Sequence, residues 1–115
     1  MKNKIILILL IVLLNSKFVI ADQLIFYADM IETTEEGNII NGIGNANVKN
    51  SMGIEIYADK FTYDKDKKLL STSGNVKVID KLKNVEIKSQ VIEYSEINQK
   101  ITSYDFTEID VDNKY

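Results

Sequence analysis

Carboxylates are the only abundant side chains of this sequence that could carry out acid–base or metal chemistry. There are 17 Asp and Glu residues but no His and no Cys, which removes Ser–His and Cys–His nucleophile pairs and the usual zinc ligand sets. Two clusters, Asp64-x-Asp66 and Asp110-x-Asp112-Asn113, resemble fragments of calcium loops. Neither continues into the glycine and distal glutamate of an EF-hand loop. We therefore predict a hairpin turn at the first cluster and a strand edge at the second, with no metal, no cofactor and no catalysis.

The N-terminal segment, from Met1 to Ala21, is typical of a signal peptide. Two lysines precede the unbroken apolar run Ile5 to Leu14, and Val19-Ile20-Ala21 supplies residues of the kind that a signal peptidase reads. The apolar run is about half of the roughly 20 residues that a membrane-spanning helix needs. We therefore expect residues 1–21 to direct export and residues 22–115 to form one domain.

The domain expected after this leader is acidic. It contains all 17 acidic residues and 11 of the 14 lysines, which gives a net charge of −6. Nucleic-acid binding needs a basic surface that displaces counterions, so we exclude nucleic acid as a partner. Because there is no cysteine, no disulfide supports the domain. Its stability must come from sheet pairing and apolar packing.

The elements that must position these side chains read as β-strands. After the leader, apolar residues recur at every second position and no helical period is visible. Turn signals rich in Gly, Asn, Asp and Ser separate the strands at short, regular intervals. We therefore predict an all-β domain. Within it we expect a turn at Asp64 to Lys68, a second turn at Ser73-Gly74-Asn75, and a short separate strand around Phe61 and Tyr63.

The segment Ile54–Val78 recurs along the chain. Leu24–Val48 aligns with it without a gap, and the Tyr-Ala-Asp and Gly-Asn motifs then coincide. Val85–Ile109 aligns with it in the same way, with Asp105-Phe106 where the other copies have Gly-Asn. A repeat of this length at nearly constant spacing indicates stacked units that bury their apolar faces against neighbours. At one shared position each copy has a small residue, which would let the backbone turn a corner there: Ala28, Ala58 and Ser89.

One set of apolar residues converges on a shared interior of these repeats. It contains no charge and therefore suits acyl chains, whose burial contributes about 0.8 kcal/mol per methylene. The same side chains could instead pack only against one another, as in any sandwich core. The candidate ligand-facing residues are Phe26, Ile54, Ile56, Phe61, Tyr63, Val76, Val78, Val85, Ile87, Ile92 and Tyr94, with Leu24, Ala28, Val48, Ala58 and Ile101 beside them.

The recurring pattern resembles a known family. I-x-A-D, then an aromatic residue with tyrosine two positions later, then G-N-V, is similar to the OstA-like domain of lipopolysaccharide-transport proteins. That family includes LptA, the N-terminal part of LptD and, more distantly, LptC, and the resemblance covers residues 22–115. It implies a twisted β-jelly-roll of about three repeats, open at both ends. The interior would shield the lipid A acyl chains of lipopolysaccharide, and edge-strand pairing with other OstA-like domains would build a bridge toward the outer membrane.

Two questions stay open at this point. A free-standing LptA-like protein and the N-terminal part of an LptD both fit the sequence, whereas the interrupted leader argues against the membrane helix of LptC. An alternative function is that of a self-assembling structural β-repeat protein without a lipid ligand.

Overall fold

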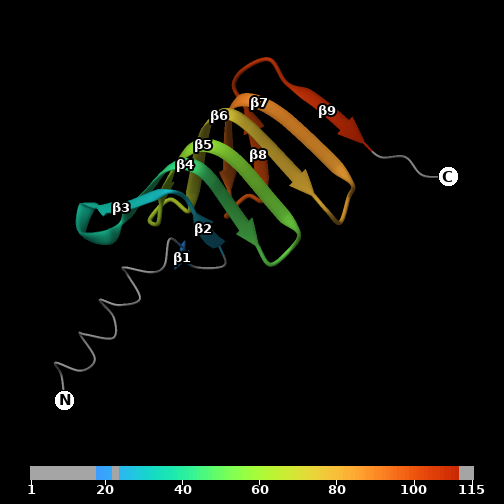
Figure 1. Ribbon diagram of the computed structural model, residues 1–115. Coiled ribbons are helices and arrows are strands. Elements are labelled where there is room, and N and C mark those ends of the chain that lie inside the picture. The colour runs from blue at the N-terminus through green and yellow to red at the C-terminus, as the bar shows by residue number, and fades with distance from the viewer. Residues whose placement is uncertain (1–17, 22–23, 112–115) are drawn as a thin grey trace.

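The computed structural model describes residues 18–21 and 24–111 (Figure 1). In this part of the chain the regular structure is β-strand apart from one short 3-10 turn, and no helix is long and apolar enough to cross a membrane. The elements are β1 (Phe18–Ala21), β2 (Leu24–Tyr27), β3 (Met30–Thr34), η1 (Glu35–Gly37), β4 (Ile39–Asn50), β5 (Ile54–Asp64), β6 (Leu69–Asp80), β7 (Val85–Ser95), β8 (Lys100–Ser103) and β9 (Glu108–Val111).

The strands form a single antiparallel sheet that does not close on itself. Its order is β1-β2-β4-β5-β6-β7-β8, while β3 pairs with β4 and β9 pairs with β7. The predicted all-β, open jelly-roll fold is therefore confirmed. Most of the predicted signal peptide lies outside the described residues, and its final segment forms β1, which pairs with β2.

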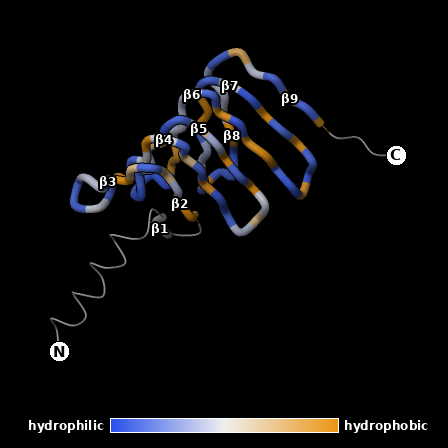
Figure 2. The backbone as a smooth tube through the Cα atoms, viewed as in Figure 1, coloured by the Kyte–Doolittle hydropathy of each residue, from blue (hydrophilic) through white to orange (hydrophobic). Residues whose placement is uncertain are grey.

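The sheet is folded over into two limbs (Figure 1). The first limb contains β2, the second half of β4, the first half of β5, the second half of β6, the first half of β7, and β9. The second limb contains β3, β8 and the remaining halves of the long strands. Hydrophobic and hydrophilic residues alternate along the long strands (Figure 2), so one face of each limb is apolar. The core lies between the two apolar faces.

A β-bulge makes each of the first two corners between the limbs. Gly74 and Asn75 have φ angles of 83° and 48°, and the register of β6 shifts there against both neighbouring strands. The Asn75 side chain donates to Asp59 Oδ2 at 3.3 Å. A Cβ atom on Gly74 would lie 2.3 Å from the same oxygen, so only glycine leaves room for Asp59. Gly44 and its neighbour repeat this arrangement in β4, with φ angles of 85° and 46°.

Two local predictions are corrected by these corners. The predicted turn at Ser73-Gly74-Asn75 is wrong, because the bulge lies inside the continuous strand β6. The predicted separate strand around Phe61 and Tyr63 is also wrong, since both residues belong to the long strand β5. Residues with a positive φ occur both in tight turns and in β-bulges. The Gly-Asn pair therefore fits either structure, and the protein has a bulge where a turn was predicted.

The third corner is built differently. Gln90 stands where the first two units have aspartate, and Asp105-Phe106 stands where they have Gly-Asn. Here the strand that pairs with β7 is interrupted, and its two pieces are β8 and β9. Without the glycine, the compact bulge of the earlier units is replaced by a connection that runs from residue 104 to residue 107.

The hairpin loops repeat the same contacts from unit to unit. The Lys65 backbone N–H donates to the Asn38 carbonyl, and the Glu96 N–H donates to the Lys68 carbonyl, each at 3.0 Å. The Asp64 to Lys68 turn is confirmed, with Asp64 Oδ1 accepting from the Lys67 N–H at 3.1 Å. Of the second carboxylate cluster, Asp110 lies in β9 at the end of the sheet, and residues 112–113 lie outside the described part of the chain.

Candidate functional site

The interior between the limbs is solidly packed in its N-terminal half. The Phe26 ring, from the first limb, lies 5.1 Å from the ring centroids of both Phe61 and Tyr63, which come from the second limb. All three rings are buried, as are the aliphatic side chains around them. The Phe61 ring also covers Gly42, where a Cβ atom would meet the ring at 2.2 Å. This half is a filled core.

The C-terminal half of the same interior is hollow. A cavity of about 380 Å³ lies between the inner faces of the two limbs. The first limb supplies Ile54, Val78, Val85 and Ile87 to its apolar wall, and the second limb supplies Tyr94 and Ile101. Polar lining comes from the strand ends and loops, so the wall between the limbs is apolar.

The change from packed to hollow follows the repeats. At the equivalent inner positions of successive units the side chains are Leu24 and Phe26, then Ile54 and Ile56, then Val85 and Ile87. The first pair is fully buried, the second pair is buried at one position and half-buried at the other, and the third pair is half-buried. Smaller side chains and the interrupted strand opposite β7 leave the space unfilled. The cavity therefore comes from divergence among the repeats.

Two hairpin loops place exposed apolar side chains at the rim of this cavity. Met52 and Leu82 line it and are 52% and 75% exposed. Each follows a capping side chain two residues earlier: Asn50 Oδ1 accepts from the Met52 N–H at 2.9 Å, and Asp80 Oδ1 accepts from the Leu82 N–H at 3.1 Å. The loops touch, because the Lys81 N–H donates to the Gly53 carbonyl at 3.0 Å. We call Met52 and Leu82 the apolar rim.

Polar groups surround the mouth of the cavity. The Asn50 side-chain amide donates to the Tyr94 hydroxyl at 3.4 Å and so links the two limbs. Asp80, Lys83 and Gln99 also border the cavity. An amphiphile in this site would therefore meet an apolar wall and a polar entrance.

One ion pair orders the outer face of the first limb behind the cavity. Lys81 Nζ lies 2.6 Å from Glu55 Oε2, and the Tyr57 hydroxyl donates to Glu55 Oε1 at 2.8 Å. The Lys81 ammonium and then the Tyr57 hydroxyl hold the pKa of Glu55 below its ordinary value of 4.5. The same hydrogen bond to Glu55 raises the pKa of Tyr57. Glu55 is therefore charged over the neutral pH range.

The predicted ligand-facing residues divide between the two halves. Five of the eleven, Ile54, Val78, Val85, Ile87 and Tyr94, line the cavity, and of these Val78 and Tyr94 are also buried. The other six are buried in the core: Phe26, Ile56, Phe61, Tyr63, Val76 and Ile92. A ligand between the limbs would contact the first group, whereas the second group is buried and does not line the cavity.

The apolar rim was not among the predicted residues. Met52 and Leu82 lie in segments that read correctly as turns, and an apolar residue in a turn gives no periodic signal. The two residues occupy equivalent positions in successive units, because Met52 follows Asn50 by two positions and Leu82 follows Asp80 by two positions. This repetition is the sequence signal that could have identified them. Among the described residues, no group of three or more Asp or Glu side chains is arranged to hold a metal ion.

This geometry defines an open β-jelly-roll with an apolar cleft between its limbs. No protein-family model and no curated protein sequence matches the chain. A similar solved structure is that of LptH from Pseudomonas aeruginosa, described as the LptA-homologous periplasmic component of the conserved lipopolysaccharide transport device. The TM-score is 0.72 at 10% sequence identity, over 84% of this chain and 79% of that chain. At this identity the likeness shows that the fold is the LptA-like one.

Proposed function

We propose that this chain is a periplasmic module of lipopolysaccharide transport that shields acyl chains between its two limbs. The observation that carries the proposal is the apolar cavity, which lies in the interior of a fold shared with a lipopolysaccharide-transport component. Each methylene moved from water into such a site contributes about 0.8 kcal/mol, so acyl chains need no specific polar contact. The saccharide would stay in water beyond the polar entrance.

The ends of the sheet supply the second part of the proposal, which is pairing with related domains. At the C-terminal end, β8 and β9 each pair only with β7 among the described strands, and Ile109 and Val111 of β9 are exposed. Such an edge presents backbone donors and acceptors to an incoming strand. At the other end, cleavage after Ala21 would remove β1 and expose the edge of β2. A strand from another OstA-like domain could take the place of β1.

Site-specific photo-crosslinking in cells that contain lipopolysaccharide tests the acyl-chain site. A photoreactive residue at Val85 or Ile87, inside the cavity, should form lipopolysaccharide adducts. The matched control is Glu86, which lies between them on β7 with its side chain on the opposite face. Adducts from Glu86 alone, or equal adducts from all three positions, would contradict the proposal.

The alternative is a structural β-repeat protein that polymerises through the same edges without lipid. It predicts filaments of lipid-free protein and no adduct from Val85 or Ile87. The transport proposal holds for a free-standing LptA-like protein and for the N-terminal part of an LptD, because both would use the same cavity and edges.

A further inference from the structure

At the N-terminal end of the sheet, the side chains that face the interior are covered. Leu24 and Phe26 of β2 point into the space between the limbs, and both are buried. The Phe26 ring packs on the rings of Phe61 and Tyr63, with centroid distances of 5.1 Å, and so fills the space behind this end. An acyl chain could cross this half only by displacing a close-packed core.

At the C-terminal end, the side chains that face the interior are uncovered. Ile109 and Val111 of β9 are the direct partners of Ile87 and Val85, which line the cavity. Directly paired residues lie on the same face of a sheet, so Ile109 and Val111 continue the apolar wall. They are 65% and 48% exposed. The apolar wall therefore runs from the cavity to an open edge of the sheet.

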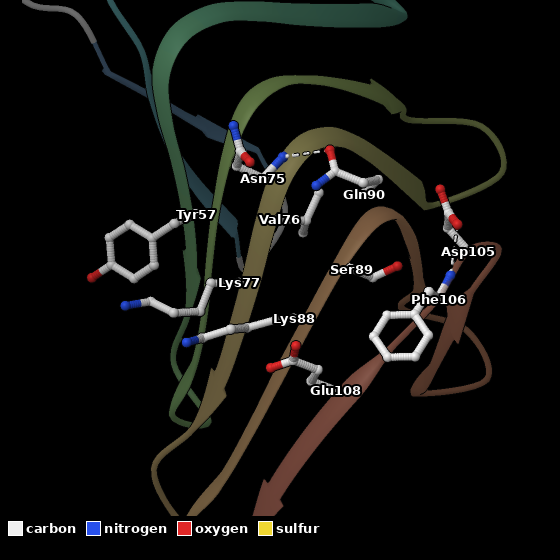
Figure 3. A pocket seen from close by; sticks show the side chains of 10 residues that line it. All are labelled: Tyr57, Asn75, Val76, Lys77, Lys88, Ser89, Gln90, Asp105, Phe106 and Glu108. Carbon is white, nitrogen blue, oxygen red and sulfur yellow. Dashed lines mark hydrogen bonds between the residues drawn. The ribbon is translucent and has the colours of Figure 1, made fainter.

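The outer side of the C-terminal end also exposes an apolar side chain. Figure 3 shows Phe106 on the connection between β8 and β9, beside a hollow of about 560 Å³ that extends over β6 and β7. Its side chain is 78% exposed. The connection is held in place, because the Ser103 hydroxyl donates to Ser89 Oγ at 2.9 Å. Apolar side chains exposed together at one end of a sheet are typical of a surface that another protein covers.

We infer that the interior is a blind cleft, which acyl chains enter and leave beside β9 without passing through the N-terminal half. This inference rests on the proposed function and adds a direction to it. The partner that delivers or receives the lipid would dock on β9 and the β8–β9 connection, with an apolar surface against Ile109, Val111 and Phe106. The N-terminal end of a second copy offers no such surface, because its inward-facing side chains are buried. Copies joined head to tail therefore could not pass acyl chains along.

Blocking each end in turn tests the blind cleft. The sequence has no cysteine, so one introduced thiol can carry a bulky polyethylene glycol maleimide at a chosen place. Val111→Cys places this label at the C-terminal end. The matched control is Met30→Cys, on the exposed side chain of the N-terminal strand β3. Each variant is compared with itself before and after labelling, so that differences in folding between the variants do not enter.

The probe is a fluorescent fatty acid supplied in phosphatidylcholine vesicles, and the measured quantity is its rate of uptake by the folded chain. Labelling V111C should slow uptake more than about tenfold, and labelling M30C should change it less than about twofold, because only the first label obstructs access. Uptake that is unaffected by the label at V111C, or equally slowed by both labels, would overturn this inference alone. If the unlabelled chain takes up no probe, the proposed function fails and this inference fails with it.

Transfer between two copies tests whether the N-terminal half conducts acyl chains. Unlabelled chain loaded with the probe is mixed with empty acceptor chains that carry the label at one end. Acceptors labelled at M30C should fill, whereas acceptors labelled at V111C, which offer only the N-terminal end, should stay empty. Equal filling of the two acceptors would contradict the blind cleft.

A variant of Phe106 tests the docking of the partner separately from the entry of the cargo. In cells, Phe106→Glu should reduce lipopolysaccharide adducts from a photoreactive residue at Ile87 to less than about half, because a charge replaces an apolar contact with the partner. The same variant should take up the fatty acid from vesicles at the normal rate. The matched control Met30→Glu should change neither measurement. Unchanged adducts in Phe106→Glu, or equal losses in both variants, would contradict docking at the C-terminal end.

Discussion

The N-terminal and C-terminal halves of the interior are built from the same repeat, but the first half is packed and the second half is hollow. In the first half, Phe26, Phe61 and Tyr63 fill the space between the limbs. In the second half, Val85 and Ile87 face a cavity. The strands, the register and the alternation are shared, so side-chain volume and the element opposite decide whether a unit supports the fold or offers a site. A repeat protein can in this way divide stability and binding between its copies.

The largest effect should come from the packed half. Phe61→Ala removes a ring that is 2% exposed and uncovers Gly42, so we expect a loss of about 3–5 kcal/mol in the free energy of unfolding. Chemical denaturation followed by circular dichroism measures this loss. A loss below about 1 kcal/mol would show that the N-terminal half is not the packed core.

A matched isoleucine pair compares the halves directly. Ile56 and Ile87 occupy the same position in successive units, but Ile56 is buried and Ile87 is half-buried beside the cavity. Ile56→Ala should cost about 2–5 kcal/mol, and Ile87→Ala should cost less than half of that, because fewer contacts are lost. Denaturation of both variants under one condition tests the difference. Equal losses of unfolding free energy in the two variants would contradict the distinction between a packed half and a hollow half.

Filling the interior gives the reverse comparison. Val48→Phe overpacks the buried core and should cost about 1–3 kcal/mol, whereas Val85→Phe extends into the cavity and should cost less than about 1 kcal/mol. Val85→Phe should also reduce lipopolysaccharide adducts formed from a photoreactive residue at Ile101, on the other wall. A stable Val85→Phe variant with unchanged adducts would argue against acyl chains in this cavity.

The smallest effect concerns the outer face, away from both halves of the interior. The pKa of Glu55 is lower in the folded chain than its ordinary value of 4.5, so the Lys81–Glu55 contact stabilises the fold at neutral pH. This contribution is lost as the pH falls below 4.5 through the lowered pKa. Glu55→Gln should cost at most about 1 kcal/mol at pH 7 and nothing at pH 2. Unfolding curves at the two pH values check this, and an equal cost at both would exclude the ionic origin.

Much of the fold could be predicted from the sequence because its period is strong. The strands, the loops and the small corner residues Ala28, Ala58 and Ser89 recur together, and all three corner residues are buried. Ile40 and Leu70 are also buried but were not in the predicted interior, since each adjoins a second apolar residue that hides the phase of the alternation. The alternation of apolar and polar residues is enough to identify a strand. It does not show which of two adjacent apolar residues points into the core.

The site could be predicted only in part, for a different reason. Ile56 and Ile87 have the same type and the same place in the repeat, yet one is core and the other lines the cavity. The difference depends on the strand that lies beside each residue in the sheet. Ile56 is paired with Val48 of the continuous strand β4, whereas Ile87 is paired with Ile109 of β9, which residues 104–107 separate from β8. The alternation of apolar and polar residues within one strand does not show which distant segment will lie beside that strand.

Methyl NMR with lipopolysaccharide that carries a spin-labelled acyl chain tests the central claim most directly. Isoleucine, leucine and valine methyl groups report from both halves of the interior in one spectrum. We predict strong broadening of the methyl signals of Ile54, Val85, Ile87 and Ile101, and little change at Leu24, Ile40 and Val48. Equal broadening in both halves, or broadening confined to outward-facing methyl groups, would contradict a lipid site between the limbs.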